Sequence, residues 1–318
     1  MRAMLCRELG AALEPADIAA PAPGPGEALI RIAACGVNFA DTLMVKGVYQ
    51  ERRALPFAPG MEIAGTVAAV GDGVSLTPGA RVAALCGYGG FAEYAVAPAA
   101  VCSPIPEKMT DAEAAGFLVA YGTTDVALAH RVDLRRGETL LVLGAAGGVG
   151  LTAVEVGKLM GATVIACARG ADKLAAARAK GADHLIDADD DIRAAVKALG
   201  GADVVYDPVG GDQFDAALRA TKPGARLLPI GFASGDVPQI PANILLVKNL
   251  TVHGVYWGGY QTLDPAVLAE SFTRLFAWWR AGKLAPHISN RLPLDRANEA
   301  LDLLRTRAAT GKVVVEIG

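Results

Sequence analysis

The positions of hydrophobic and polar residues divide the chain into two parts with different patterns. In residues 1–118, apolar and polar positions alternate over short runs such as "EALIRIAA" (27–34) and "FAEYAVAP" (91–98), and turn clusters such as "PAPGPGE" (21–27) separate the runs. Alternation of this kind is typical of strands that bury one face. Several such strands at short spacing predict a small β-rich domain, either a barrel or a sandwich.

The pattern changes after about residue 111. A stretch with helical period covers residues 111–130, and strand–helix alternation follows it. The strands here are uninterrupted apolar runs, expected at residues 138–144, 162–168, 184–188, 202–210 and 225–231. Helices are expected between them, at residues 149–161 and 171–181, and again after residue 261, where a final strand covers 311–318. Apolar strands that alternate with helices predict an α/β fold with a doubly wound parallel sheet.

Composition narrows the class of protein. A chain of 318 residues that is 53% hydrophobic and 20% charged can bury two sizeable cores. The net charge is −3 and no basic stretch is present, so nucleic acid and membrane surfaces are not expected partners. The five cysteines are widely spaced and odd in number, which favours a reducing compartment and predicts a cytoplasmic protein. The four histidines are scattered and give no closely spaced zinc motif.

The clearest chemical signal is "LVLGAAGGVG", residues 141–150, which lies between an apolar strand and an apolar helix. Its A-x-G-x-x-G spacing over Ala145, Gly147 and Gly150 resembles a dinucleotide fingerprint whose first glycine is replaced. Gly147 and Gly148 allow the backbone to approach a pyrophosphate, and the helix that starts at Val149 offers unpaired N–H groups. Gly150 allows this helix to pack closely on the sheet.

The end of the second strand of the sheet predicts which cofactor binds. Ala168 stands where an NAD site places a carboxylate, and Arg169 and Lys173 follow it. A cationic pair without an acid suits the 2′-phosphate of NADPH, although both side chains can also be solvated residues of a helix start. Two further glycine-rich loops follow predicted parallel strands and are either contacts to the nicotinamide end or ordinary turns. They are "DPVGG" with Gly210 and "IGFASG" with Gly231 and Phe232.

These residues together resemble the medium-chain dehydrogenase/reductases, specifically their zinc-independent quinone oxidoreductase branch. The markers are "CGVNFADTLMVKGVY", "PGMEIAGTVAAVGDGV", "LVLGAAGGVGLTAVEVGKLMGATVIA", "YDPVGG" and "GKVVV". The resemblance implies a GroES-like catalytic domain from residues 1–118 and 261–318 around a Rossmann domain from residues 119–260. It also implies a homodimer through edge strands, with residues 248–256 as that strand, and a cofactor contact from Lys312.

The resemblance also bears on metal binding. Zinc alcohol dehydrogenases carry a cysteine ligand where Asn38 stands, and a histidine ligand where Met61 precedes a glutamate. An amide and a thioether are poor zinc ligands, so no catalytic metal is expected. Two positions depart from the quinone reductase pattern, since Val119 replaces a common threonine and Ala188 replaces a common tyrosine near the adenosine. The expected nicotinamide contact at residue 119 is therefore in question.

The expected reaction is hydride transfer from NADPH to a quinone, an acceptor that needs no Lewis acid. Asn38 is expected to donate its amide to the acceptor or the ribose, with Asp41 and Thr42 orienting the loop and Tyr49 shaping the pocket or supplying a proton. Asp41 and Thr42 fit a helix cap equally well, and Tyr49 fits a packed aromatic. Trp257 and Tyr260 are expected to line either the acceptor site or a dimer interface.

Two other functions fit the same residues. The first is an NADPH-dependent enoyl or 2-alkenal reductase acting on α,β-unsaturated carbonyls or enoyl thioesters. The second is a non-catalytic NADPH-binding protein, because a glycine loop and a basic pair predict binding and not turnover.

Overall fold

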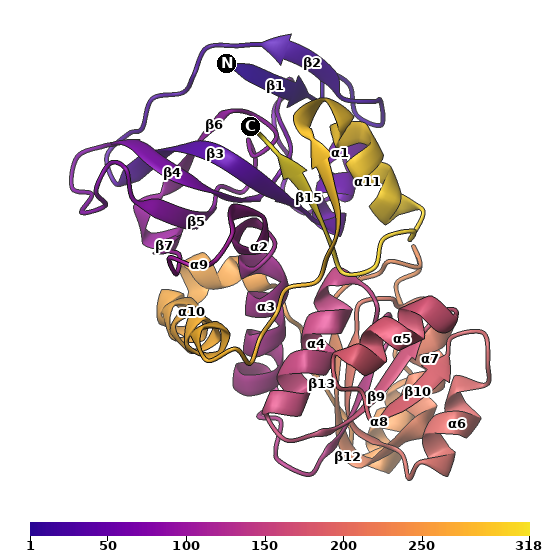
Figure 1. Cartoon of the computed structure of the whole chain (residues 1–318). Helices are drawn as coiled ribbons and strands as arrows, with labels where there is room; N and C mark the ends of the chain where they lie inside the picture. Colours follow the sequence, from indigo (N-terminus) through magenta and orange to yellow (C-terminus); the bar gives the residue numbers. More distant parts are fainter. The chain divides into compact units, whose positions relative to one another are not determined.

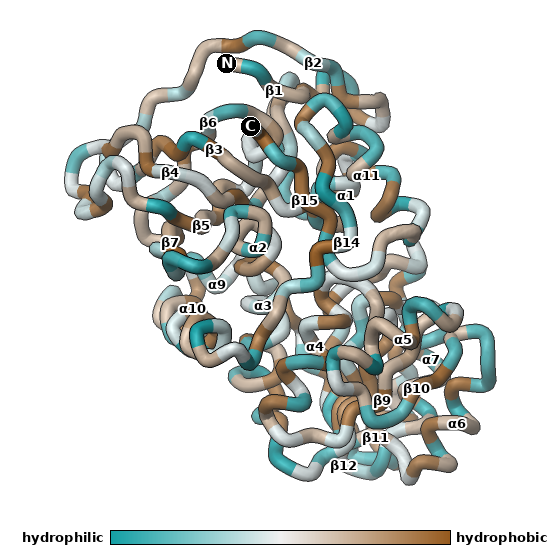
Figure 2. The backbone as a smooth tube through the Cα atoms, in the orientation of Figure 1, coloured by the Kyte–Doolittle hydropathy of each residue, from teal (hydrophilic) through white to brown (hydrophobic).

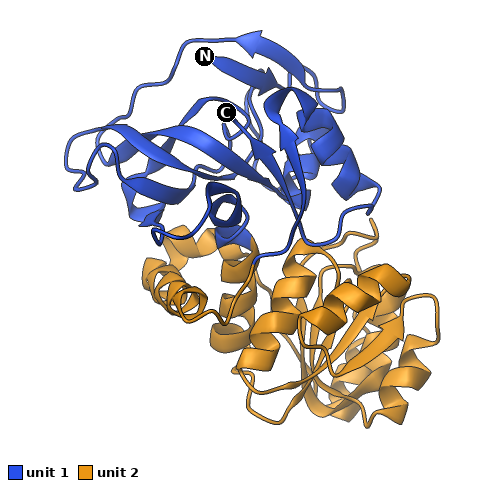
Figure 3. Ribbon diagram, in the orientation of Figure 1, with its two compact units in different colours: residues 1–119, 286–318 blue, residues 120–285 orange.

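The computed structural model describes residues 1–318, which form two compact units (Figure 3). Unit 1 contains Met1–Val119 and Pro286–Gly318, and unit 2 contains Ala120–Ala285. The sequence places the return to the first domain at residue 261, whereas residues 261–285 cluster with unit 2.

Unit 1 is built on a seven-stranded sheet whose central strand is β3 (Glu27–Val37). Its neighbours β4 and β15 both run antiparallel to it, and its buried and less buried residues alternate as predicted. The remaining strands of the unit are β1 (Arg2–Leu5), β2 (Glu14–Asp17), β4 (Glu62–Val70), β5 (Arg81–Leu85), β6 (Tyr94–Pro98), β7 (Cys102–Pro104), β14 (Ile288–Pro293) and β15 (Lys312–Glu316). Figure 1 shows β15, from the end of the chain, beside β3 from its beginning.

The helices of unit 1 are α1 (Phe39–Lys46), α2 (Asp111–Ala115) and α11 (Ala297–Arg305), with 3₁₀ turns at Ala99–Val101 and Leu294–Arg296. Helix α1 begins directly after β3, with Asn38 as its N-cap, and ends at Gly47, whose φ of 78° allows a left-handed C-cap. The pairing of Val313 with Val37 places the start of β15 next to Asn38.

Unit 2 contains a six-stranded sheet in which every pair of neighbours is parallel. The spatial order is β10-β9-β8-β11-β12-β13, the order of a doubly wound Rossmann sheet, so the predicted fold class is confirmed. The apolar runs of β9 and β11 are brown in Figure 2, as expected for strands covered on both faces. The strands are β8 (Thr139–Val142), β9 (Thr163–Ala168), β10 (His184–Asp187), β11 (Ala202–Asp207), β12 (Thr221–Pro229) and β13 (Thr251–Val252).

The helices of unit 2 alternate with these strands along the chain. They are α4 (Gly148–Leu159), α5 (Ala171–Ala179), α6 (Ile192–Ala198), α7 (Gly211–Ala220), α8 (Ala242–Lys248), α9 (Tyr260–Leu263) and α10 (Pro265–Arg280), with a 3₁₀ turn at Trp257–Gly259. The stretch 111–130, predicted as one helix, is interrupted near Gly116 and continues as α3 (Leu118–Asp125) and a π-helical segment at Val126–Arg131.

A buried ion pair explains why residues 261–285 lie with unit 2. Asp125 at the end of α3 is fully buried, and Arg274 of α10 donates to both of its carboxylate oxygens, at 2.9 and 2.6 Å. Trp257 and Phe272 pack edge to face in the same region. A buried carboxylate needs such a partner, so α10 is held against α3.

Helix α4 carries a second anchoring carboxylate. Glu155 accepts hydrogen bonds from the Tyr121 hydroxyl at 2.5 Å, from Lys180 Nζ at 3.1 Å and from the Ala285 N–H at 3.1 Å. Both charged side chains are nearly buried. Glu155 therefore holds residues near both ends of unit 2 to the helix that follows the glycine loop.

Candidate active site

The glycine loop of unit 2 joins β8 to α4 and has the geometry of a tight turn. Gly144 adopts φ +56°, and its carbonyl accepts the Gly147 N–H at 2.9 Å. Ala145 is fully buried, and its N–H donates to the carbonyl of Cys167 in β9 at 2.9 Å. The left-handed position is thus Gly144, one residue before Ala145, so the replaced fingerprint glycine does not disturb the turn.

Positions 147 and 150 are occupied by glycine for different physical reasons. A Cβ added to Gly150 would lie 2.2 Å from the carbonyl oxygen of Gly144, so close packing requires a glycine there. A Cβ added to Gly147 would touch only that same oxygen, at 3.4 Å, and its φ of −75° and ψ of 174° suit any residue. Neither packing nor backbone conformation requires a glycine at position 147, whereas close approach by a ligand would require one.

The start of α4 can bind an anion at this place. The first N–H groups of a helix have no acceptor within it, and here they belong to Gly148, Val149 and Gly150. Gly147 is exposed, and Gly148 and Val149 are half-buried. These residues therefore fit the pyrophosphate of a dinucleotide.

Three buried hydroxyl groups form a chain of contacts that reaches the start of α4, and sequence reasoning missed them. Thr152 Oγ1 donates to the Val149 carbonyl at 2.9 Å and lies 2.7 Å from Thr124 Oγ1, which in turn lies 3.0 Å from the Tyr206 hydroxyl. Burial raises the pKa of Tyr206 well above its usual range, so its hydroxyl stays protonated. Threonines in an apolar helix were the only sequence signal for this group.

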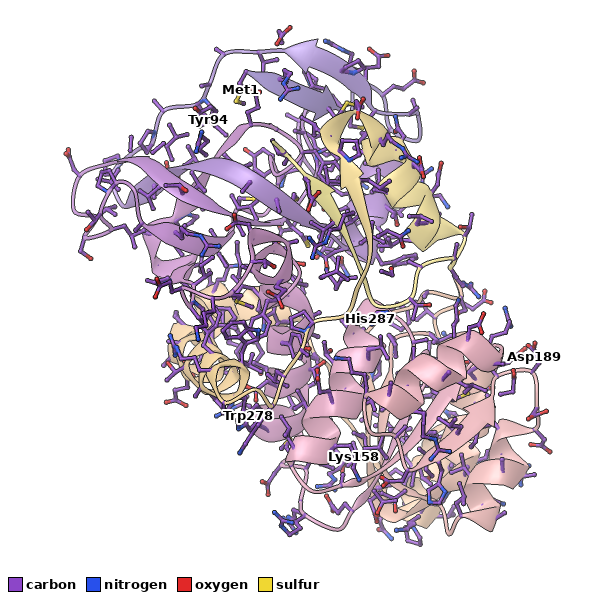
Figure 4. All side chains as sticks on the ribbon, viewed as in Figure 1. Met1, Tyr94, Lys158, Asp189, Trp278 and His287 are labelled. Atoms are coloured by element: carbon purple, nitrogen blue, oxygen red, sulfur yellow. The ribbon has the colours of Figure 1, made fainter.

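The predicted cationic pair follows β9. Ala168 is the buried last residue of the strand, Arg169 is exposed, and Lys173 is half-buried in the first turn of α5. Arg169 Nε donates to Asp189 Oδ1 at 2.9 Å, with both side chains largely exposed. Asp189, labelled in Figure 4, lies on the loop after β10. An exposed ion pair of this kind is weak, so a phosphate can compete for Arg169.

The loops after β11 and β12 meet because these strands are neighbours in the sheet. The fully buried Asp207 accepts the N–H groups of Val209 at 2.7 Å and Gly210 at 3.0 Å. Burial raises the pKa of Asp207 to about 6, against the effect of these hydrogen bonds. Gly231 N–H donates to the Asp207 carbonyl at 3.3 Å, and the half-exposed Phe232 lies beside Gly210.

In unit 1 the Asn38 side chain belongs to a buried polar group with Glu62 and Lys312. Lys312 Nζ donates to Glu62 Oε1 at 2.6 Å, to Asn38 Oδ1 at 2.8 Å and to the Val37 carbonyl at 3.2 Å. Asn38 Nδ2 donates to Glu62 Oε1 at 2.9 Å, and Glu62 Oε2 accepts the Val119 N–H at 2.9 Å. We refer to Asn38, Glu62 and Lys312 as the polar triad.

The other predicted residues of unit 1 are Asp41 and Thr42 in the first turn of α1 and Tyr49 after its C-terminal end. Asp41 is fully buried and accepts the N–H groups of Asn38 at 2.8 Å and Gly60 at 3.0 Å, and burial raises its pKa to about 7. Thr42 Oγ1 donates to the Phe39 carbonyl at 2.6 Å. Tyr49 is half-buried, and its pKa is raised first by burial and then by Glu51. Asp41 and Thr42 therefore contact backbone groups of the turn.

The donor set near Asn38 is poor in metal ligands. Burial raises the pKa of Cys35 well above its usual value, and Cys86 Sγ lies 3.3 Å from the Gly60 carbonyl, so both are thiols and not thiolates. Met61 is partly buried against the core of the unit. No group of three or more His, Cys, Asp or Glu side chains is arranged to hold a metal ion.

Sequence reasoning missed the roles of Glu62 and Lys312 in the triad. The available signal was a single charge at the start of an apolar strand, in "EIAG" and in "GKVVV". Trp257 and Tyr260, expected at an acceptor site or an interface, are nearly buried and pack on Phe272 and His130.

Over nearly its whole length the chain is similar to quinone oxidoreductase-like proteins. Residues 24–107 match the alcohol dehydrogenase GroES-like domain, and residues 148–272 match the family described as zinc-binding dehydrogenase. The chain is 41% identical over 323 residues to the quinone oxidoreductase-like protein 2 homolog of Nematostella vectensis, covering 99% of this chain and 88% of the relative.

Solved structures agree with this placement. The quinone oxidoreductase of Thermus thermophilus, solved also with NADPH, superposes with a TM-score of 0.87 at 35% identity and full coverage of both chains. The Escherichia coli quinone oxidoreductase complexed with NADPH superposes with a TM-score of 0.93 at 27% identity, covering 99% of this chain and 100% of the other. The GroES-like and Rossmann architecture predicted from sequence is therefore confirmed. Separately, none of the helices combines the length and apolar character that crossing a membrane requires.

Proposed function

The chain belongs to the medium-chain dehydrogenase/reductase superfamily, and from this premise we propose that it reduces a quinone with NADPH and without a catalytic metal ion. The observation that carries the proposal is the polar triad. An amide held by a lysine and a glutamate stands where zinc dehydrogenases have a cysteine ligand, and a thioether follows at Met61. The name of the similar Nematostella protein supports the substrate class.

The glycine loop and the residues after β9 fit NADPH. Gly147, Gly148 and Val149, with Ala145 behind them, would hold the pyrophosphate, and Arg169 and Lys173 would hold the 2′-phosphate. Gly210, Gly231 and Phe232 would contribute the loops for the nicotinamide end. When bound, NADPH supplies the hydride. The absence of an acid at Ala168 supports NADPH over NADH.

In unit 1 we assign Asn38 as the residue that binds the electron acceptor, the quinone. The amide would donate to the acceptor carbonyl as negative charge develops on it, which stabilises the reduced form. Asp41 and Thr42 would keep the turn that carries Asn38 in place through their contacts with backbone groups. Tyr49 would shape the pocket and supply a proton from its hydroxyl group.

A nicotinamide-oxidation assay tests this function. The panel contains quinones, enones and enoyl thioesters, with NADPH or NADH, in the presence and absence of a chelator. We expect the fastest turnover with NADPH and a quinone, unchanged by the chelator. Faster turnover of enones or enoyl thioesters would instead identify an enoyl or alkenal reductase, and binding of NADPH without turnover would identify a binding protein.

The edge of the Rossmann sheet supports a homodimer. Strand β13 is paired on one side only, and α8 next to it in the chain exposes Leu246 (77%) and Val247 (74%). We expect Leu246→Glu with Val247→Lys to convert a dimer to a monomer in analytical ultracentrifugation, and an unchanged mass would contradict this interface. The five free cysteines support a location of the protein in the reducing cytoplasm.

A further inference from the structure

Two opposite charges are buried next to Asn38, and they come from distant parts of the chain. Glu62 is 1% exposed at the start of β4, and Lys312 is 5% exposed at the start of β15. Removing two charges from water is costly unless the pair is fully hydrogen-bonded. Here it is, because Lys312 has three acceptors and both oxygens of Glu62 accept N–H groups.

The pair holds Asn38 by both ends of its amide. Oδ1 accepts from the Lys312 ammonium at 2.8 Å, and Nδ2 donates to the Glu62 carboxylate at 2.9 Å. A flipped amide would direct its N–H groups at the ammonium and its oxygen at the carboxylate, and both contacts would be repulsive. The charges therefore select one of the two orientations.

In this orientation Asn38 keeps one N–H that is not committed to a short bond. Its only other contact from Nδ2 is to the Gly36 carbonyl at 3.4 Å, which is near the limit of a hydrogen bond. The oxygen, in contrast, is occupied by the ammonium. The side chain can thus offer this N–H to a ligand as a donor.

The contacts of Lys312 argue against direct binding of the cofactor by its ammonium group. An ammonium group has three donors, and Glu62, Asn38 and the Val37 carbonyl take all of them within unit 1. A phosphate would have to displace one of these partners from a nearly buried site.

We propose that Lys312 and Glu62 are positioning residues that orient the Asn38 amide so that it presents an N–H to the carbonyl oxygen of the acceptor. This assignment rests on the proposed reduction of a quinone. It predicts that the pair affects catalysis through Asn38, and that neither charge contributes once the amide is gone.

A double-mutant cycle on turnover tests the coupling. Wild type, Asn38→Ala, Lys312→Met and the double variant are compared with NADPH and the fastest quinone. We expect each single variant to lose about 10- to 100-fold in kcat with little change in the Kd for NADPH, and the double variant to match Asn38→Ala. Losses that multiply in the double variant, or a raised Kd with kcat intact, would overturn the proposal.

Further variants keep the test valid if Lys312→Met, which leaves Glu62 buried without its cation, does not fold. Lys312→Met/Glu62→Gln removes both charges together, and we expect the same loss of kcat from it. Lys312→Arg keeps the cation, and we expect it to recover part of kcat. Lys222→Met breaks an ion pair with Asp203 on the surface and serves as the matched control, expected to leave kcat unchanged.

Nuclear magnetic resonance of the Asn38 side-chain amide gives a readout that needs no turnover. The signal is identified by its loss in Asn38→Ala. In the wild type we expect slow exchange and well-separated Nδ2 protons, and in Lys312→Met/Glu62→Gln we expect both features to be lost. An unchanged signal would refute the positioning role. If the signal changes as expected but the wild type reduces no acceptor, the proposed function fails while the positioning of the amide stands.

Discussion

Alanine at Gly147 or at Gly150 distinguishes a glycine that a ligand requires from one that the fold requires. A Cβ on Gly150 would lie 2.2 Å from a backbone oxygen and 2.8 Å from the Cα of Ala145, and neither atom can move without shifting the turn. A Cβ on Gly147 would lie 3.4 Å from its nearest neighbour, which is an ordinary contact. We therefore predict opposite phenotypes for two positions in the same loop.

The expected magnitudes follow from these distances. Overpacking in Gly150→Ala lowers the free energy of unfolding by about 1–3 kcal/mol or more. In Gly147→Ala, the poorer N-cap and the reduced entropy of the unfolded chain oppose each other, so its stability changes by less than about 1 kcal/mol. In the proposed complex, the methyl group of Gly147→Ala would stand where the pyrophosphate approaches the first N–H groups of α4. Losing one charge-assisted hydrogen bond there costs about 1.5–3 kcal/mol and raises the Kd for NADPH about 10- to 100-fold.

Two measurements check this prediction. Urea denaturation followed by tryptophan fluorescence gives the free energy of unfolding, and fluorescence titration gives the Kd for NADPH. Each variant is the control for the other. The reasoning is refuted if Gly147→Ala binds NADPH as the wild type does, or if it loses as much stability as Gly150→Ala.

Three further predictions concern charges. Burial raises the pKa of Asp41 to about 7, compared with about 3.9 in the unfolded chain. The protonated carboxyl therefore contributes stability below about pH 4, and this contribution is lost as the pH rises through about 7. Denaturation at several pH values should show the free energy of unfolding falling over this range, and Asp41→Asn should remove the fall. Arg169→Ala should raise the Kd for NADPH about 10-fold and leave the Kd for NADH unchanged, whereas Asp189→Asn, which removes the competing carboxylate, should tighten NADPH binding; equal effects on both cofactors would contradict this role. Glu155→Gln should lower the free energy of unfolding by about 1–3 kcal/mol, more than Tyr121→Phe, because it also leaves Lys180 without its carboxylate; equal losses in denaturation would show that the charge contributes nothing.

The polar triad explains why the chain needs Asn38 and not merely a helix cap. Many residues can cap α1, and Asp41 already accepts the Asn38 N–H. Only a side chain with an acceptor at one atom and donors at the other can satisfy Lys312 and Glu62 together. An amide meets that requirement, and the same amide leaves one N–H for an acceptor molecule.

Local pattern was sufficient for much of the fold. The alternation in β3 and the apolar runs of β9 and β11 identified two kinds of sheet before any contact was known, since the period of buried positions is a property of neighbouring residues. The same holds for the glycine loop, whose spacing identifies the turn and the helix that follows it. The prediction of one helix over residues 111–130 was wrong at Gly116, because the apolar period continues across the point where α2 ends. After the interruption, the Val119 N–H donates to the Glu62 carboxylate and not to a helix carbonyl.

The local pattern could not predict which residues far apart in the chain form hydrogen bonds or ion pairs with each other. The sequence by itself determined the two kinds of domain and the place of the glycine loop between an apolar strand and an apolar helix. Only the tertiary structure decided that Arg274 pairs with Asp125 across 149 residues, which moves residues 261–285 into unit 2, and that Lys312 contacts Asn38 across 274 residues. The physical reason is that a hydrogen bond between distant segments depends on the register of the strands that carry them, and register is set by the packing of the whole sheet and not by the residues next to the bond.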